Sequence, residues 1–403
     1  MRVALLCLTL TAACTASPAA TDTANGSDAV GDAADVTPTQ GFGEVWAQGI
    51  ADYLGLAKVA TQATADGVTT YEFDVKSGPM CLRGDPFRMA VRDQKSDNLM
   101  IFLQGGGACW STYCLAIQKA PAGIPKLDVL DPAKATNPFK DWNQVYLPYC
   151  DGSMFAGEAD ADDNGDGVLD RRQHGLRNLT AALDIGVAQF PHPKRITLMG
   201  SSGGGFGTIP GILLVRKLWP DVEILVVQDS GTGTGKEGDP AFLAELVKEF
   251  NVKRFFPPSC TDCGTSAHLT PLLNWELARD QNLRVAAFSS YNDSIMSGVF
   301  FKIDPALFKQ GLLEATGALH TAYPDRYKRF LIDGTMHTTM LGDVSGLVGS
   351  DLTAVTLPPD AMTALASIVI GNIDDTKQGD VSMAAWLLAA QGNTAAWQDL
   401  LAP

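Results

Sequence analysis

Residues 195–205 read RITLMGSSGGG, an apolar segment that runs directly into a glycine-rich turn containing two serines. The residues up to 218 are predicted to be helical, so this stretch predicts a strand, a sharp turn and a helix. Residues 200–204 (GSSGG) have the G-x-S-x-G pattern, in which small residues flank a nucleophilic serine on a strained turn. We therefore predict Ser202 as the nucleophile; the alternative is a plain glycine-rich turn. Pro210 should kink or delay the helix.

Apolar segments with the lengths of strands and helices alternate on both sides of this stretch. Strands are predicted at 88–92, 99–104, 144–149, 195–200, 223–228, 283–290 and 327–332, and helices at 176–190, 205–218, 306–316 and 383–391. A hairpin around Asp66-Gly67 precedes them. This order predicts an α/β fold, with a mostly parallel sheet and helices on both faces. Because no repeat or Pro- or Ser-rich break follows residue 43, residues 44–403 are predicted to form a single catalytic domain.

A serine nucleophile needs a base to take its proton and a carboxylate to orient that base. In a fold of this kind, both follow the serine in the order acid and then histidine, each just past the end of a strand. Asp293 follows the strand at 283–290 and His337 follows the strand at 327–332, so we predict these two residues as acid and base. Asp229 is the rival acid, but it lies one strand too early and could instead brace the sheet edge by hydrogen bonding.

The same chemistry needs backbone N–H groups that stabilise an oxyanion. The segment 104–108 (QGGGA) follows a predicted strand and has the glycine content of such a loop. We predict the amides of Gly106, Gly107 and Gly203 as the donors. A phosphate-binding loop is the competing interpretation, but no Lys-Ser or Lys-Thr pair follows the glycines.

These motifs resemble those of the pectin acetylesterase (Notum-like) family over roughly residues 79–340. The resemblance is carried by the segments 79–86, 102–109, 146–152, 200–205 and 228–231. Three residues depart from the family pattern: Arg83, Asp85 and Gln104. Beyond these segments, His337 is the main recognisable residue in the C-terminal part.

The resemblance implies an α/β-hydrolase-like fold and ester hydrolysis without a cofactor. It also implies that Ser202, Asp293 and His337 form a catalytic triad, and that Asp229 is a structural residue. A disulfide between Cys109 and Cys114 is implied as well. We add a Cys81–Cys150 bridge as a further expectation.

The negative charge of the chain is concentrated in two short segments. The formal net charge is −15, and residues 14–40 and 158–170 hold four and six carboxylates, respectively, without a Lys or Arg. A protein that binds nucleic acid needs a basic face, so this balance argues against such a partner.

The second acidic segment fits a calcium-binding loop at 162–173. Its predicted ligands occupy alternate positions: Asp162, Asn164, Asp166 and Asp170 through side-chain oxygens, and Val168 through its backbone carbonyl. Gln173 replaces the bidentate Glu of such loops, which weakens the site. Six carboxylates so close together repel one another without a cation, which favours calcium over the alternative of a solvated acidic loop.

The N-terminus predicts export. Residues 1–13 (MRVALLCLTLTAA) have the pattern of a signal peptide, and Cys14 lies where a bacterial lipoprotein would be lipidated. Ordinary secretion is the alternative. Residues 14–43 lack the apolar side chains of a core and are predicted to be a flexible acidic tether. An exported chain with six further cysteines is expected to contain disulfides. The candidates are Cys81, Cys109, Cys114, Cys150, Cys260 and Cys263.

Together these features predict an exported serine carboxylic-ester hydrolase that is anchored to a bacterial cell envelope by an N-terminal lipid. We expect a monomer that removes acetyl groups from a polysaccharide such as pectin, without a catalytic cofactor and without a nucleic-acid partner. One alternative is a carboxylesterase acting on a lipid or an acylated protein. Another is a calcium-binding surface lipoprotein with a vestigial triad.

Overall fold

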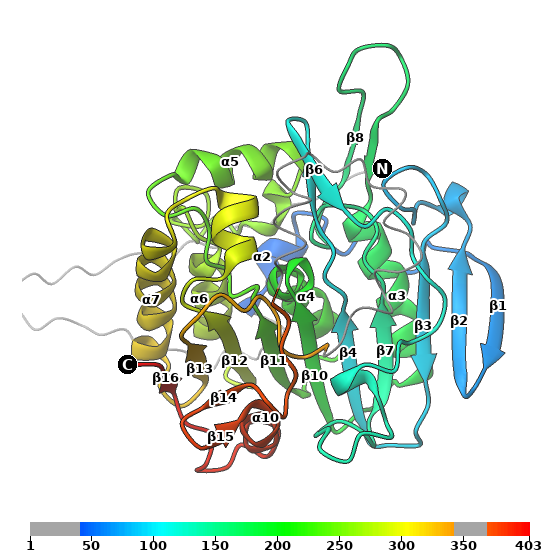
Figure 1. The fold of residues 1–403 in the computed structure, drawn as a ribbon. Helices are drawn as coiled ribbons and strands as arrows, with labels where there is room; N and C mark the ends of the chain where they lie inside the picture. Colours follow the sequence, from blue (N-terminus) through cyan, green and yellow to red (C-terminus); the bar gives the residue numbers. More distant parts are fainter. Residues whose placement is uncertain (1–40, 342–368) are drawn as a thin grey trace, which may run out of the picture. The chain divides into compact units, whose positions relative to one another are not determined.

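A large twisted sheet carries the fold (Figure 1). The computed structural model of the 403-residue chain describes residues 41–341 and 369–403. The predicted signal peptide, the lipidation site at Cys14 and nearly all of the predicted tether lie outside these residues. The described residues belong to one compact unit, Val36–Pro403.

Ten of the described strands form the sheet in the order β1-β2-β3-β7-β4-β10-β11-β12-β13-β16. Their bounds are β1 Val59–Ala65, β2 Val68–Phe73, β3 Arg88–Arg92, β4 Asn98–Leu103, β7 Asn143–Leu147, β10 Arg195–Ser201, β11 Glu223–Asp229, β12 Leu283–Ser290, β13 Tyr327–Ile332 and β16 Leu400–Leu401. The pairs from β7 to β16 are parallel, whereas β1, β2 and β3 form an antiparallel extension at one edge. The predicted mostly parallel α/β sheet is therefore confirmed.

Three small hairpins lie outside this sheet. Their described strands are β5 Gly107–Trp110 with β6 Tyr113–Ala116, β8 Ala159–Ala161 with β9 Arg171–Gln173, and β14 Lys377–Gln378 with β15 Val381–Ser382. The α-helices in the described residues are α2 Gly43–Trp46, α3 Gly175–Gln189, α4 Gly203–Leu218, α5 Pro240–Glu249, α6 Thr270–Arg279, α7 Pro305–Ala322 and α10 Met383–Gly392. A π-helical turn, η4, covers Ile295–Phe301. No helix in the described ranges has both the length and the apolar character needed to cross a bilayer.

The central strands bury side chains on both faces, as a sheet covered by helices must. On β4, Leu99, Ile101 and Leu103 pack into the apolar layer that includes α3, α4 and α6. Met100 and Phe102 point the other way, into the layer that includes α10. The prediction of helices on both faces is confirmed.

Helix α4 differs from its prediction at Pro210. The helix begins at Gly203, directly after the turn, and continues through Pro210 to Leu218. Proline removes one backbone hydrogen bond from the helix. Every residue from 203 to 216 is buried, however, and tertiary packing of this kind outweighs local propensity. The proline therefore does not delay the helix.

Three disulfides lie among the described residues. Cys109 and Cys114 close the β5–β6 hairpin, and Cys81 bridges to Cys150 after β7, the pairs expected above. Cys260 and Cys263 close a short loop before α6. The first two bridges fasten segments next to the glycine loop at 104–108.

Candidate active site

The turn between β10 and α4 places Ser202 at the carboxyl edge of the sheet. Ser202 has φ 53° and ψ −122°, a conformation that is unfavourable for a residue with a side chain. Its N–H donates to the Asp229 carbonyl oxygen at 2.7 Å, and its carbonyl accepts from the Phe206 N–H at 3.2 Å. The strained serine is thus held from both sides, as a serine on a nucleophile elbow would be.

The glycines of the G-x-S-x-G pattern allow this turn to close. A Cβ atom on Gly200 would collide with the carbonyl of Gly204. A Cβ atom on Gly204 would collide with the carbonyl of Leu103 on the neighbouring strand β4. The pattern therefore reflects close backbone packing of β10, α4 and β4 around Ser202.

His337 and Asp293 lie in line with Ser202. The Nε2 atom of His337 is 2.8 Å from the Ser202 hydroxyl, and its Nδ1 atom is 2.9 Å from an Asp293 carboxylate oxygen. An ionised carboxylate can only accept, so Nδ1 donates to Asp293 and Nε2 is left to accept the serine proton. The structure thus brings together three residues that are up to 135 positions apart in the sequence.

Asp293 is fixed by its own backbone surroundings. Its side chain is fully buried, and one carboxylate oxygen accepts hydrogen bonds from the N–H groups of Ile295 and Met296, each at 3.0 Å. These two residues begin the turn η4. The carboxylate is therefore held in one orientation, with its other oxygen 2.9 Å from the histidine.

The rival carboxylate, Asp229, has a different set of partners. It is fully buried at the end of β11 and accepts from the Ser201 hydroxyl at 2.8 Å. The backbone N–H groups of Thr339 and Met340 also donate to it, at 3.0 and 3.1 Å. Asp229 therefore ties the residue before Ser202 to the segment just after His337.

The pKa of Asp229 is set mainly by burial, whereas that of His337 is set by a balance between burial and neighbouring carboxylates. Burial raises the pKa of Asp229 to about 6, although its three hydrogen bonds oppose this shift. For His337, burial disfavours the charged imidazolium. The charge and hydrogen bond of Asp293, with a smaller effect of Asp229, outweigh burial and raise the histidine pKa above its usual value.

We expect the activity of this site to fall on the acid side of neutrality. A general base must be unprotonated, and a raised pKa keeps His337 protonated to a higher pH. The kcat/KM for a neutral ester should therefore decline as the pH falls, with a midpoint above 6.5, the ordinary value for histidine. Measurement of kcat/KM from about pH 5 to pH 9 tests this. A flat profile down to pH 5 would contradict His337 as the base.

The three predicted oxyanion donors are placed differently. Gly107 and Gly203 line the same pocket as Ser202, and the Gly107 carbonyl lies against Gly203. Gly106 packs against the Tyr149 ring, and its carbonyl accepts from the Ile117 N–H at 2.8 Å. Gly107 and Gly203 are thus the two candidates that lie at the pocket, next to the nucleophile.

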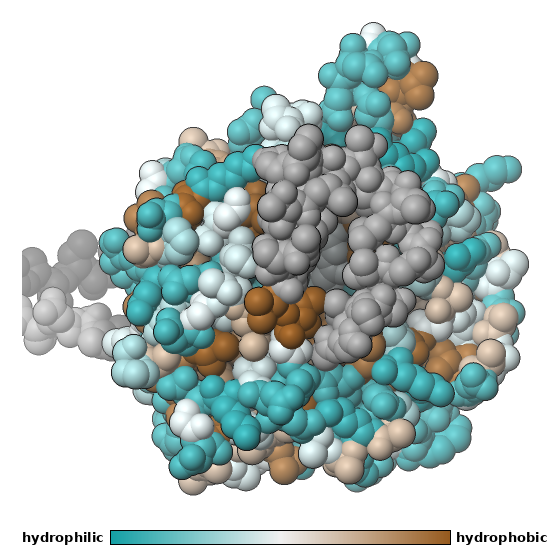
Figure 2. Space-filling view, viewed as in Figure 1, coloured by the Kyte–Doolittle hydropathy of each residue, from teal (hydrophilic) through white to brown (hydrophobic). Residues whose placement is uncertain are grey.

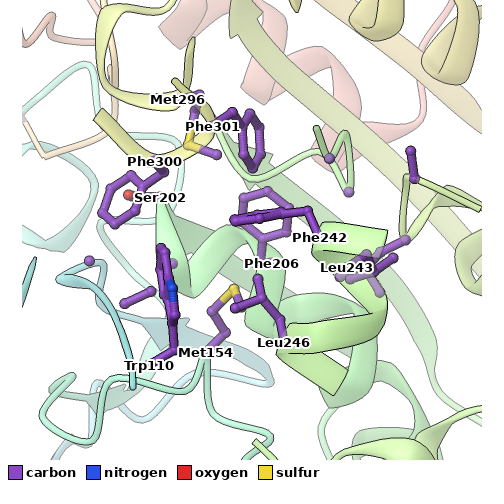
Figure 3. A pocket seen from close by; sticks show the side chains of 17 residues that line it. Trp110, Met154, Ser202, Phe206, Phe242, Leu243, Leu246, Met296, Phe300 and Phe301 are labelled. Carbon is purple, nitrogen blue, oxygen red and sulfur yellow. The ribbon is translucent and has the colours of Figure 1, made fainter. Parts of the chain in front are cut away.

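An apolar pocket opens at Ser202 (Figure 3). It has about 610 Å³ of empty space, part of it open to solvent. Apart from Ser202 and the indole N–H of Trp110, its side chains are apolar. The largest of them are Trp110, Met154, Phe206, Phe242, Leu243, Leu246, Leu269, Met296, Phe300 and Phe301. The nucleophile therefore faces a hydrophobic space.

This pocket was not predicted from the sequence, because its walls come from elements that the apolar periodicity did not indicate. Phe242, Leu243 and Leu246 belong to α5, a ten-residue helix, and Met296, Phe300 and Phe301 belong to η4. One feature of the sequence could have indicated the pocket. The apolar run 295–301 (IMSGVFF) directly follows the predicted acid Asp293, where a wall of the site would be expected.

The structure does not support the predicted calcium site. The loop between β8 and β9 projects from the surface, and its side chains accept hydrogen bonds from its own backbone (Figures 1 and 2). Asp162 accepts from the N–H groups of Gly165 and Gly167, each at 2.7 Å, and Asp163 pairs with Arg171. Backbone amides therefore stabilise the charge of Asp162, and an arginine of the same chain stabilises that of Asp163. Within residues 41–341 and 369–403, no group of three or more His, Cys, Asp or Glu could hold a metal ion.

The predicted ligands Asp162, Asn164, Asp166, Val168 and Asp170 all belong to this projecting loop. Figure 2 shows the loop as mainly hydrophilic with an apolar patch, and Val168 is 65% exposed. A solvated acidic loop, the alternative considered above, describes it better.

Comparison with known proteins identifies the family. A family model described as Pectinacetylesterase matches residues 60–264, about half of the chain. The chain belongs to the pectinacetylesterase family. This match includes Ser202 and the glycine loop, whereas Asp293 and His337 lie beyond it. Their assignment therefore depends on chain order and on the geometry described above.

Two plant members of the pectinacetylesterase family are among the similar proteins. Pectin acetylesterase 11 of Arabidopsis thaliana is 28% identical over 229 residues, which cover 52% of this chain and 58% of that protein. Pectin acetylesterase 4 of the same plant is 30% identical over 149 residues, which cover 34% of this chain and 36% of that protein. The aligned region thus spans little more than half the length of Pectin acetylesterase 11.

Proposed function

We propose that the protein is a serine-dependent carboxylic-ester hydrolase with Ser202, His337 and Asp293 as its triad. The observation that carries this proposal is the line of hydrogen bonds from the Ser202 hydroxyl through His337 to the Asp293 carboxylate. A buried imidazole held between a hydroxyl and a carboxylate is the arrangement that activates serine for acyl transfer. Membership of the pectinacetylesterase family supports the same reaction.

The proposed reaction proceeds in two halves. His337 accepts the Ser202 proton through Nε2 as the serine oxygen attacks the acyl carbonyl carbon, and it then returns that proton to the departing alcohol. Water, activated by the same histidine, then attacks the acyl-serine and releases the carboxylic acid. Asp293 stabilises the imidazolium in both halves, and the amides of Gly107 and Gly203 are the proposed donors to the oxyanion.

We propose an acetylated polysaccharide such as pectin as the first substrate to test. The support comes from the family and from the two plant relatives, which are named as pectin acetylesterases. The three disulfides fit an oxidising compartment, where a polysaccharide of the cell exterior would be met. Export, with or without a lipid on Cys14, is part of the proposal.

A lipid or acyl-protein ester is the second candidate, and the apolar pocket favours it. An acetyl methyl group is comparable in size to one water molecule, whose share of the liquid is about 30 Å³. The pocket at Ser202 holds about 610 Å³ of empty space, including its open part. A longer acyl chain would cover the aromatic and aliphatic walls of the pocket, which an acetyl group leaves exposed to water.

Measurement of acid release separates these candidates. Purified protein is incubated with acetylated pectin, acetylated xylan, a small chromogenic acetate ester and a long-chain chromogenic ester, and the acid released from each is quantified. Release from a polysaccharide supports the first candidate. Hydrolysis of the small ester alone would support ester hydrolysis but reject a polysaccharide as the substrate. Failure to hydrolyse any ester, including long-chain esters, would reject the proposed activity.

A further inference from the structure

A second apolar chamber lies behind the pocket at Ser202. It has about 480 Å³ of empty space, part of it open to solvent, and lies between α4 and the segment from α5 to residue 256. Residues found only in this inner chamber include Ile209, Pro210, Val247, Val252 and Phe256. Ser153 supplies the only polar side chain in its lining.

The two chambers are separated by shared side chains. Met154, Leu243, Leu246, Phe206 and Leu269 line both of them. Figure 3 shows Met154 and Leu246 close to each other below Phe206, and Ser202 lines the outer chamber only. Methionine and leucine side chains change rotamers readily, and methionine in particular adapts to irregular apolar surroundings.

We propose that the inner chamber is a binding site for the distal end of a long apolar acyl chain, whose ester carbonyl lies at Ser202. This inference rests on the proposed ester hydrolase function and on its second candidate substrate. Met154 and Leu246 form the partition that the chain passes, so these residues set the acyl length that the enzyme prefers.

Empty apolar spaces are rare in proteins. Protein interiors are packed as densely as organic crystals and contain few voids larger than a water molecule. Apolar cavities that do exist stay dry and accept apolar ligands. The inner chamber borders the pocket at Ser202 through the side chains that line both, so an acyl chain held at Ser202 could reach it by displacing them. Each methylene group buried there should increase the binding affinity roughly fourfold.

A series of p-nitrophenyl esters with acyl chains of increasing length tests this proposal. For the natural sequence, we expect kcat/KM to rise from the acetate through the octanoate and to remain high for the dodecanoate. Val247→Phe fills the inner chamber without touching the outer one. It should lower kcat/KM for the dodecanoate at least tenfold and leave the acetate within about twofold.

Ala244→Phe is the matched control, because Ala244 lies on the exposed face of the same helix α5. This variant should leave the whole series unchanged. If Val247→Phe does not fold, as judged by its circular dichroism, Val252→Phe fills the same chamber from the neighbouring segment and replaces it.

Two results would overturn the proposed role of the inner chamber in binding the acyl chain. One is a steady fall of kcat/KM from the acetate onward in the natural sequence, and the other is an equal effect of the filling variant on short and long esters. Hydrolysis of the acetate that depends on Ser202 would still stand in both cases. Absence of hydrolysis for every ester would instead reject the proposed function itself.

Discussion

We expect Ser202→Ala to lower kcat for a small chromogenic ester by about ten-thousandfold or more. Removal of a nucleophilic serine leaves only the catalysis that binding and the oxyanion donors supply. KM should change little, because the hydroxyl is lost without altering the apolar walls of the pocket. The protein should also cease to react with an organophosphate, which labels an activated serine. Steady-state kinetics and mass spectrometry of the labelled protein measure both effects.

Ser201→Ala is the matched control for this experiment. Ser201 is the adjacent residue, is fully buried and donates its hydroxyl to Asp229 at 2.8 Å. Its loss removes one of three hydrogen bonds to that carboxylate and should lower kcat by no more than about tenfold. Activity that persists in Ser202→Ala, or that disappears equally in both variants, would remove Ser202 as the nucleophile.

The position of Ser202 was predictable because the relevant constraint is local. A strand, a small-residue turn and a helix lie within 24 consecutive residues from Arg195 to Leu218, and the strained serine needs glycine on both sides. The positions of the parallel strands along the chain were accessible for a similar reason, since each strand is a short apolar run with its own boundaries.

The choice between Asp229 and Asp293 needed information that is not local. Both follow or end an apolar strand, and both are fully buried carboxylates near the edge that holds Ser202. Which of them meets the histidine depends on the path of the chain after β13. That path brings Nδ1 of His337 to Asp293 and the backbone of Thr339 to Asp229.

The pocket and the internal contacts of the acidic loop could not be predicted from the sequence, for other physical reasons. The walls of the pocket combine α5, η4 and the β5 hairpin, so the space exists only after distant segments have packed together. The acidic loop has the spacing of a calcium site, but spacing does not reveal which carboxylates the loop's own amides will occupy. Hydrogen bonds to Asp162 and the ion pair of Asp163 with Arg171 answer that question in the structure.

Asp293→Asn should lower kcat by about ten-thousandfold while the fold is kept. The amide has nearly the shape of the carboxylate, but it can no longer hold Nδ1 as the donor or stabilise the imidazolium. The charge and hydrogen bond of Asp293 also raise the pKa of His337, so their loss should move the acid limb of the remaining activity to lower pH. Kinetics over the same pH range, with circular dichroism as the check on folding, measure both changes.

Asp229→Asn provides the comparison that separates a carboxylate acting on the histidine from one that positions its segment. Its partners are the Ser201 hydroxyl and the amides of Thr339 and Met340, all of which are donors. An asparagine would turn an NH₂ group toward at least one of them, so the segment after His337 should shift. Misplacement of about 1 Å costs on the order of a hundredfold in rate, which sets the expected loss well below that of Asp293→Asn.

The two variants should also differ in their pH profiles. Asp229 has only a smaller influence on the pKa of His337, so the acid limb should move less in Asp229→Asn than in Asp293→Asn. If Asp229→Asn instead gave the larger loss of kcat and the larger shift of the limb, the acid of the triad would be Asp229. The hydrogen bonds of His337 to Asp293, at 2.9 and 3.0 Å, lead us to expect the opposite result.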